Sequence, residues 1–229
     1  MHLEHRIGLI FGQSIMLNSQ RLNSFTLREP GSKMKNNLKS YLNILNSLSA
    51  CSKLKLIYFE ISFKALESPF LLPKSFYNFV SHYYFLTEIC FSGFGFDSNM
   101  DYQSFQSLIS LQILKIATCI LDLNSFESFF SNNFPKLNHF SFWSNILVNS
   151  DDNSNLNQMN SILKKRNKFP PIVEIGLPFG YCSDYIEYFM FQALINCKTL
   201  TMKYLKVTFG ENCNSEIPKF HNFLKNSKI

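Results

Sequence analysis

The sequence predicts an α/β protein built as a solenoid, with a curved parallel sheet on its concave side and helices on its convex side. One apolar spacing recurs seven times along the 229 residues, and helix-like segments separate its occurrences. The composition agrees, because 46% hydrophobic and 17% charged residues are typical of a chain that folds around a core. In such an array each unit buries its apolar side against the units next to it.

The recurring spacing is Φ-x-x-Φ-x-Φ, where Φ is an apolar residue. Alternate side chains of a strand share one face, so the last two Φ positions point into the core and the residues between them point away. The first Φ lies in the turn that leads into the strand. The seven occurrences cover residues 22–27, 54–59, 86–91, 111–116, 137–142, 172–177 and 202–207.

The segments between these predicted strands have helical periodicity. Residues 38–48 carry leucines at i, i+4, i+7 and i+10, which lie on one side of a helix. Residues 101–109 begin with Asp101, a suitable N-cap, and the apolar residues of 156–163 also recur at helical spacing. Each unit is therefore predicted to run strand, turn, helix, turn.

The pattern divides the chain into three parts. Residues 21–213 are predicted to hold about seven repeats, residues 1–20 a cap or flanking segment, and residues 214–229 a C-terminal helix or cap. The apolar stretch 7–17 is interrupted by glycine and polar residues and has no small-residue cleavage site after it, so we expect no signal peptide. No other segment approaches the roughly 18 apolar residues that span a bilayer, and no membrane span is expected.

Two units continue the spacing to eleven residues, LQILKIATCIL at 111–121 and LNHFSFWSNIL at 137–147. They resemble the leucine-rich repeat, whose strand consensus is L-x-x-L-x-L-x-x-N/C-x-L. Cys119 and Asn145 occupy the N/C position of that consensus. The resemblance implies that both side chains form hydrogen bonds with backbone groups in the turn that leaves the strand, as a structural ladder.

Cys51 and Cys197 lie just ahead of two predicted strands, which is similar to the ribonuclease-inhibitor-like subtype with long repeats and outer helices. The remaining units depart from the consensus, because other residues fill the N/C position: Pro30, Ser62, Phe94, Gly180 and Gly210. An α/β domain of another kind, whose parallel strands share the spacing, stays open as the alternative.

No pattern of residues indicates catalysis. The chain contains no G-x-x-x-x-G-K-[ST], no H-E-x-x-H and no G-x-S-x-G. The carboxylates of residues 151–152 lie in a polar stretch that favours a solvated loop over a cation site. We therefore predict a protein that is not an enzyme and has no cofactor and no metal.

Charge and cysteine content bear on partners and compartment. The net charge is +6, but the only basic run is residues 164–166, typical of the exposed end of a helix, so no nucleic-acid partner is expected. The six cysteines form no C-x-x-C pair and no dense framework, which favours reduced thiols and an intracellular, cytoplasmic protein.

The x positions of the predicted strands form the concave surface, which solenoids commonly use to bind partners. The residues predicted to bind a protein partner are Lys55, Tyr58, Lys115, His139, Trp143, Tyr204 and Lys206, with Glu88, Glu174 and Lys203 on the same surface. Trp143, Tyr58 and Tyr204 are the proposed anchors, because tryptophan and tyrosine are enriched at binding hot spots. Partly buried aromatic residues with no binding role remain the alternative for each of them.

The function predicted from these features is a non-enzymatic protein-protein interaction scaffold, a subunit of a larger assembly with no small-molecule substrate. The alternative is a regulator of an enzyme, either a substrate receptor of a ubiquitin ligase or a GTPase activator. An activator of that kind usually presents an arginine, and Arg28 is the candidate.

Overall fold

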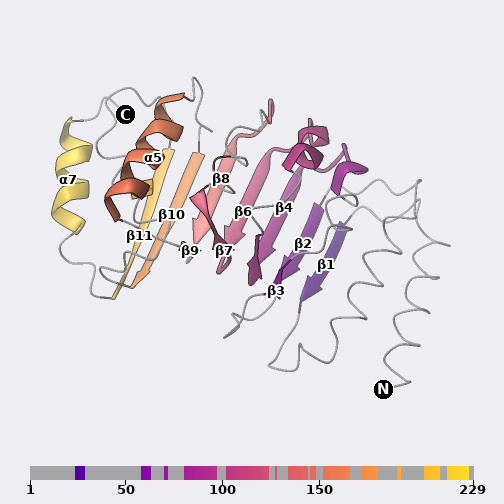
Figure 1. The fold of residues 1–229 in the computed structure, drawn as a ribbon, viewed down its shortest axis with the longest axis horizontal. Coiled ribbons are helices and arrows are strands. Elements are labelled where there is room, and N and C mark those ends of the chain that lie inside the picture. The colour runs from indigo at the N-terminus through magenta and orange to yellow at the C-terminus, as the bar shows by residue number, and fades with distance from the viewer. Residues whose placement is uncertain are drawn as a thin grey trace, which may run out of the picture.

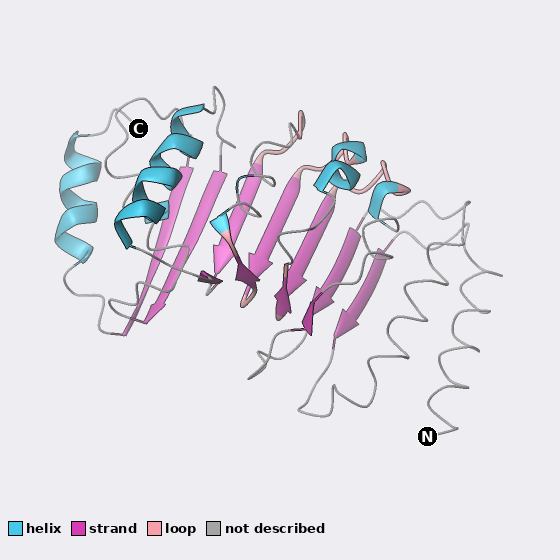
Figure 2. Cartoon of the chain, in the orientation of Figure 1, coloured by secondary structure: helices cyan, strands magenta, loops and turns pink. Residues whose placement is uncertain are grey.

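The computed structural model describes residues 24–28, 58–62, 70–71, 80–96, 102–123, 127, 134–143, 145–147, 152–165, 172–179, 190–191, 204–211 and 216–226. Over these ranges the chain forms two parallel sheets with a few helices, which is an α/β arrangement (Figures 1 and 2).

The larger sheet has seven strands, all parallel to their neighbours. Its strands are β1 (Ser24–Arg28), β2 (Tyr58–Ser62), β4 (Glu88–Ser92), β6 (Ile113–Ala117), β8 (His139–Trp143), β10 (Ile172–Phe179) and β11 (Tyr204–Glu211). They lie side by side in the order in which they follow one another along the chain. The parallel sheet of an α/β protein, predicted from the sequence, is confirmed.

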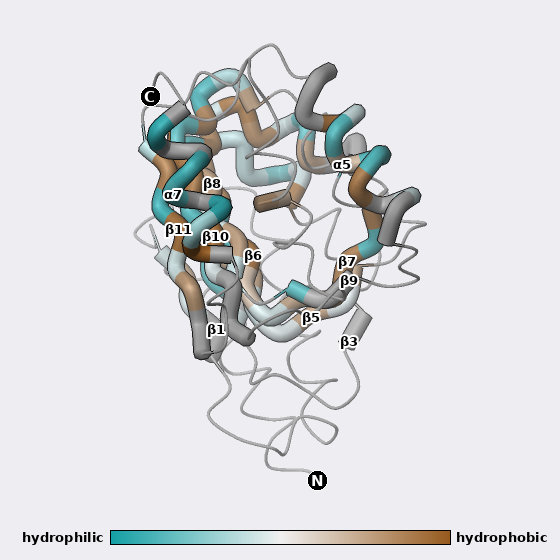
Figure 3. Tube along the Cα trace, turned by 90° about the vertical axis from the view of Figure 1, so that its left-hand side faces the viewer, coloured by the Kyte–Doolittle hydropathy of each residue, from teal (hydrophilic) through white to brown (hydrophobic). Residues whose placement is uncertain are grey.

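A second parallel sheet has four strands of two residues each, in the order β3 (Phe70–Leu71), β5 (Phe94–Gly95), β7 (Ile120–Leu121) and β9 (Ile146–Leu147). Each of these strands comes after one of the long strands β2, β4, β6 and β8. Seen along the row of long strands, β5, β7 and β9 lie at the lower right, opposite β8, β10 and β11 (Figure 3). The apolar spacing did not predict this sheet, because two residues are too few to show an alternation.

Three helices are described over their whole length. A 3-10 helix, η2 (Tyr102–Ser107), lies inside the predicted helix 101–109 and is shorter than expected. The α-helix α5 (Asp152–Lys165) contains the predicted periodic segment 156–163 and lies across from the long strands in Figure 3. The α-helix α7 (Glu216–Asn226) lies within the segment assigned to a C-terminal helix. The predicted helix at 38–48 falls outside the described residues.

The core consists of two rows of apolar side chains on one face of the larger sheet. In the register, the first row runs through Phe25, Ile89, Leu114, Phe140 and Val173, and the second through Phe91, Ile116, Phe142 and Ile175. All nine side chains are at most 5% exposed. Burying a large apolar side chain stabilises a fold by roughly 1.5–3 kcal/mol, so these rows are a main source of stability.

The predicted register of the second unit is wrong by two residues. The sequence analysis took residues 57 and 59 as its core pair, but the structure pairs Phe59 with Ile89 and Ile61 with Phe91. The slip arises because residues 56–61 satisfy the same apolar spacing as residues 54–59. In consequence Ser62 pairs with Ser92 at the end of the strand and does not occupy the N/C position.

The sixth unit contains the same error. The structure aligns Val173 and Ile175 with the core residues of β8, where the sequence analysis placed Ile175 and Leu177. Residues 172, 175 and 177 fit the apolar spacing, whereas the observed register puts Pro170 at its first position, so the spacing favoured the wrong register. Because both slips are even, they leave every outward residue on the outward side.

The chain leaves β4 and β6 through backbone conformations with positive φ. Gly93 has a φ of 82° and Thr118 a φ of 51°, and they follow the paired residues Ser92 and Ala117. Glycine adopts positive φ freely, whereas a β-branched residue is strained there. The Thr118 hydroxyl lies 2.9 Å from the Ser92 hydroxyl, and this hydrogen bond helps to hold the turn.

Candidate functional site

The face of the larger sheet opposite the core is called the outward face and is defined here on strands β2 to β11. Its first row is Tyr58, Glu88, Ile113, His139, Ile172 and Tyr204. Its second row is Glu60, Cys90, Lys115, Ser141, Glu174 and Lys206. Its third row is Ser62, Ser92, Ala117, Trp143, Gly176 and Thr208.

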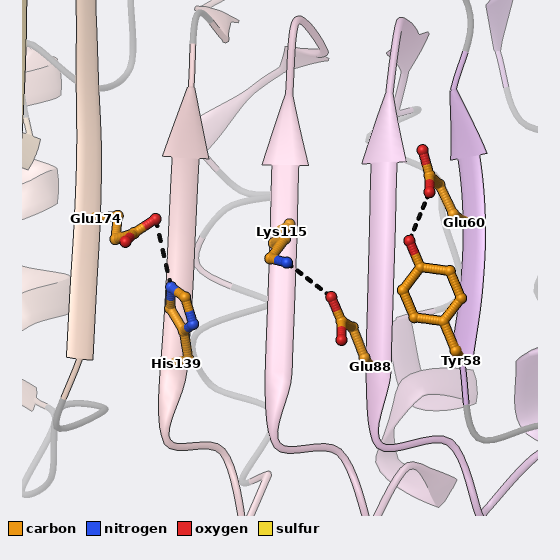
Figure 4. A network of polar contacts seen from close by, with 6 residues as sticks. All are labelled: Tyr58, Glu60, Glu88, Lys115, His139 and Glu174. Atoms are coloured by element: carbon orange, nitrogen blue, oxygen red, sulfur yellow. Dashed lines mark hydrogen bonds and ion pairs between the residues drawn. The ribbon is translucent and has the colours of Figure 1, made fainter. Parts of the chain in front are cut away.

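Six of the residues predicted to bind a partner lie on this face: Tyr58, Lys115, His139, Trp143, Tyr204 and Lys206. Glu88 and Glu174, which the sequence also placed on this surface, lie there as well (Figure 4). Lys55 and Lys203 fall outside the described residues. Strand alternation thus brings residues that are far apart in the sequence onto one surface.

Lys115 and Glu88 form an ion pair between the neighbouring strands β6 and β4. The Lys115 Nζ donates to Glu88 Oε1 over 2.7 Å, which is the length of a charge-assisted hydrogen bond. This hydrogen bond raises the pKa of Lys115, and burial opposes the shift. The Lys115 side chain is 39% exposed, so solvent screens the pair and its contribution to stability is small.

Tyr58 and Glu60 interact within strand β2. The Tyr58 hydroxyl donates to Glu60 Oε2 at 2.5 Å, and Glu60 is only 6% exposed. Burial, together with the neighbouring Glu60 carboxylate, raises the pKa of Tyr58 because both disfavour a phenolate. Tyr58 is half-buried and already bonded, which makes it a poorer anchor than the sequence suggested.

Glu174 stands between two basic side chains but contacts both at longer range. Its Oε2 lies 3.5 Å from His139 Nε2, and its Oε1 lies 3.7 Å from Lys206 Nζ. His139 Nε2 is buried and has no hydrogen bond, so the contact with Glu174 is an ion pair only when the imidazole is protonated. The carboxylate of Glu174 is therefore held less tightly than that of Glu88.

Trp143, at the end of β8, is 41% exposed and lies against Gly176 of β10. A Cβ atom built on Gly176 would come within 2.3 Å of Trp143 Cε3, 2.4 Å of Cδ2 and 2.8 Å of Cζ3. The indole thus occupies the space that a side chain at position 176 would fill. A glycine inside a strand often marks such a close approach, and this signal was available in the sequence.

Tyr204 is the other strongly exposed aromatic residue on the outward face, at 50%. It belongs to β11, which is hydrogen-bonded only to β10 among the described strands of the sheet. Trp143 and Tyr204 therefore keep the features expected of anchors, a large apolar surface open to solvent.

Asn145 and Cys119 lie in the turns that leave β8 and β6. Asn145 is fully buried, and its Oδ1 accepts a hydrogen bond of 3.0 Å from the Cys119 backbone N–H. Its Nδ2 donates to the Ile116 carbonyl over 2.9 Å. The Cys119 thiol donates to the Ala117 carbonyl over 3.2 Å, and burial raises its pKa to about 12. Both side chains thus bond backbone groups at the end of β6 or in the turn that follows it, and the raised pKa of Cys119 disfavours its thiolate.

Phe94 occupies the equivalent position after β4, since β5, β7 and β9 align it with Cys119 and Asn145. It is 1% exposed, so an apolar ring replaces the polar side chain at this turn.

The described residues contain no group of three or more histidine, cysteine or acidic side chains that could hold a metal ion. No helix among them has the length and apolar character needed to cross a membrane. Comparison of the chain with protein-family models, with curated proteins and with solved structures gives no match in any of the three.

Proposed function

We propose that the chain is a leucine-rich-repeat solenoid and that it acts as a non-enzymatic scaffold, binding a protein partner on the outward face. The observation that carries the repeat assignment is the order of the strands. Seven parallel strands adjoin one another in chain order, and a short strand follows β2, β4, β6 and β8. The buried hydrogen bonds of Asn145 support the same assignment, since the leucine-rich repeat uses this position to bond the turn.

The exposed aromatic side chains support the outward face as the binding surface. Trp143 and Tyr204 present apolar area that water covers in the free chain, and covering it with a partner is favourable. The three carboxylates of the face all have partners within it. Binding therefore depends on aromatic contacts more than on long-range electrostatic attraction.

A scaffold is proposed in preference to a GTPase activator. An activator presents an arginine to the active site, and the candidate Arg28, on β1 and paired with Ser62, lies at the opposite end of the sheet from the exposed aromatic residues of β8 and β11. The buried thiol of Cys119 forms no disulfide, which supports an intracellular compartment.

Affinity purification of the tagged chain from its native cells, with mass spectrometry, tests the proposal. The variant pair Trp143→Ala and Tyr204→Ala is expected to lose a stoichiometric partner that the parent retains. The control is Ser161→Ala, an exposed position on α5, which is expected to retain it. Equal recovery of all partners by the outward-face variant and the control would exclude this surface.

A further inference from the structure

The side chains around Trp143 are unusually small. In the third row of the outward face, the strands that flank it contribute Ala117 and Gly176, and β11 contributes Thr208. The position equivalent to Trp143 is therefore small on every strand from β2 to β11 except β8. None of these side chains is long enough to fold over the indole, and Trp143 is 41% exposed.

The ring lies flat on the strand beside it. The three atoms nearest to the Cβ position of Gly176, namely Cδ2, Cε3 and Cζ3, are consecutive in the six-membered ring. An edge-on approach to Cε3 would leave both of its bonded neighbours much farther away. The near-equal distances of 2.3, 2.4 and 2.8 Å instead put the ring face over Gly176. One π-face of the indole thus rests on β10, and the opposite π-face points to solvent.

Two charged residues of the second row are diagonal neighbours of Trp143, Lys115 on β6 and Glu174 on β10, and Lys115 is already bonded to Glu88. The three rows contain three glutamates and two lysines from β2 to β11, and β1 adds Arg28 in register with Ser62, so the face is close to neutral although the whole chain carries +6. Glu174 precedes Gly176 by two residues on β10 and shares its face, which makes it a diagonal neighbour of Trp143.

Glu174 also has bonding capacity that the other two glutamates lack. Glu60 and Glu88 accept hydrogen bonds of 2.5 and 2.7 Å. The contacts of Glu174 with His139 and Lys206, at 3.5 and 3.7 Å, are longer than charge-assisted hydrogen bonds. Each oxygen therefore faces a basic side chain, His139 on one and Lys206 on the other, and can still accept a shorter hydrogen bond from an incoming donor.

We propose that the partner segment bound at Trp143 carries an arginine, whose guanidinium stacks on the outer π-face of the indole and donates to Glu174. The inference rests on the proposed function, because it names the chemistry of a partner for the same surface. Arginine fits better than lysine, since its planar guanidinium stacks on aromatic faces and pairs with carboxylates through two donors.

The fluorescence of Trp143, the single tryptophan of the chain, reports directly on this site. The full chain is titrated with a blocked tripeptide of arginine and with the matched citrulline and lysine tripeptides. Citrulline keeps the planar shape of arginine without its charge. We expect a saturable fluorescence change and an affinity for the arginine peptide roughly 5-fold or more above that for the others.

Substitutions then assign the effect to the two residues, with the anisotropy of labelled peptides as readout. Trp143→Leu is expected to lower the affinity for the arginine peptide roughly 5-fold, and Trp143→Phe is expected to recover part of it. Glu174→Gln is expected to reduce the preference for arginine over citrulline. Tyr84→Leu is the matched control, because Tyr84 is 49% exposed and lies off the outward face. Circular dichroism verifies that each variant is folded.

Equal binding of the arginine and citrulline peptides would overturn the proposal, as would undiminished binding by Trp143→Leu. Tighter binding of a leucine tripeptide would overturn it in favour of an apolar partner. All three results leave the scaffold function intact if the outward-face variant still loses its cellular partner. Binding of the arginine peptide by a chain that captures no partner through this face would instead support the site and contradict the scaffold function.

Discussion

The middle of the larger sheet and its β11 end follow the same apolar pattern but differ in burial. In β4 the core residues Ile89 and Phe91 are fully buried, and β6 and β8 are alike. In β11 the equivalent residues Leu205 and Val207 remain partly exposed. The difference shows that the apolar pattern of a strand does not by itself determine its burial, and an end position does not either, because Phe25 on β1, at the other end of the sheet, is only 5% exposed.

The sharpest test of this comparison is a pair of core truncations. Phe142→Ala in β8 removes a fully buried ring and is expected to cost about 3–5 kcal/mol of unfolding free energy. Val207→Ala at the equivalent position of β11 is expected to cost about 1 kcal/mol or less, because less area is lost. Urea denaturation followed by circular dichroism measures both. Similar losses at the two sites would refute the comparison.

Asn145→Leu tests the turn between the two sheets. The substitution removes both hydrogen bonds and leaves the Cys119 N–H and the Ile116 carbonyl buried without these partners. We expect a loss of about 2–4 kcal/mol, at roughly 1–3 kcal/mol for each unpaired group with some relaxation. Asn145→Asp keeps an acceptor for the N–H but loses the donor, so its cost separates the two bonds. A neutral Asn145→Leu variant would mean that the turn is held by packing alone.

Gly176→Ala tests the contact between β10 and the indole. The added methyl group would clash with the ring, so the indole must lift away at a cost of about 1–3 kcal/mol. The fluorescence emission of Trp143 is expected to shift to longer wavelength, because the π-face of the indole that rests on Gly176 becomes exposed to water. The control is Ser141→Ala, because Ser141 lies in the second row and is paired with Glu174. Unchanged emission from Gly176→Ala would contradict the flat orientation.

Thr118→Gly is expected to stabilise the fold, unlike the substitutions above. The threonine adopts a φ of 51°, where glycine is unstrained, so the substitution stabilises the turn by up to about 1 kcal/mol. The lost hydroxyl contact with Ser92 reduces this gain. Thr118→Ala loses the contact but keeps the strain, and the difference between the two variants measures the strain itself. A thermal midpoint for Thr118→Gly below that of Thr118→Ala would exclude backbone strain at position 118.

The smallest effect is expected at the ion pair of Lys115 and Glu88. The pKa of Lys115 is raised in the folded state, so the pair contributes fully below the ordinary pKa of 10.5 and is lost as pH rises through the folded-state pKa. Exposure limits the contribution to roughly 1 kcal/mol. Lys115→Met should be less stable than the parent at pH 8, and the difference should shrink as the pH rises above 10.5. A difference that does not change with pH would mean that packing of the lysine stem causes it.

The sequence was sufficient to predict the sheet and most of its outward face, because both depend on the alternation of apolar residues. It misplaced the second and sixth strands by two residues, since an even slip preserves that alternation. The two-residue strands and the ion pairs depend on how neighbouring strands are aligned, which no local pattern encodes. The flat orientation of Trp143 follows from Gly176, a residue 33 positions away that only the register brings beside it.

The strand order also determines how the sheet would come apart under load. Each strand of the larger sheet is hydrogen-bonded only to the preceding and following strands of that sheet, so a force that pulls β11 away acts first on its hydrogen bonds to β10 and on the contact of Phe209 with Phe191. The hydrogen bonds of the row would then separate one strand at a time, from the β11 end. Under a load applied through β11 the sheet would thus separate gradually from that end and pair again when the load is removed, as a compliant element and not a rigid one.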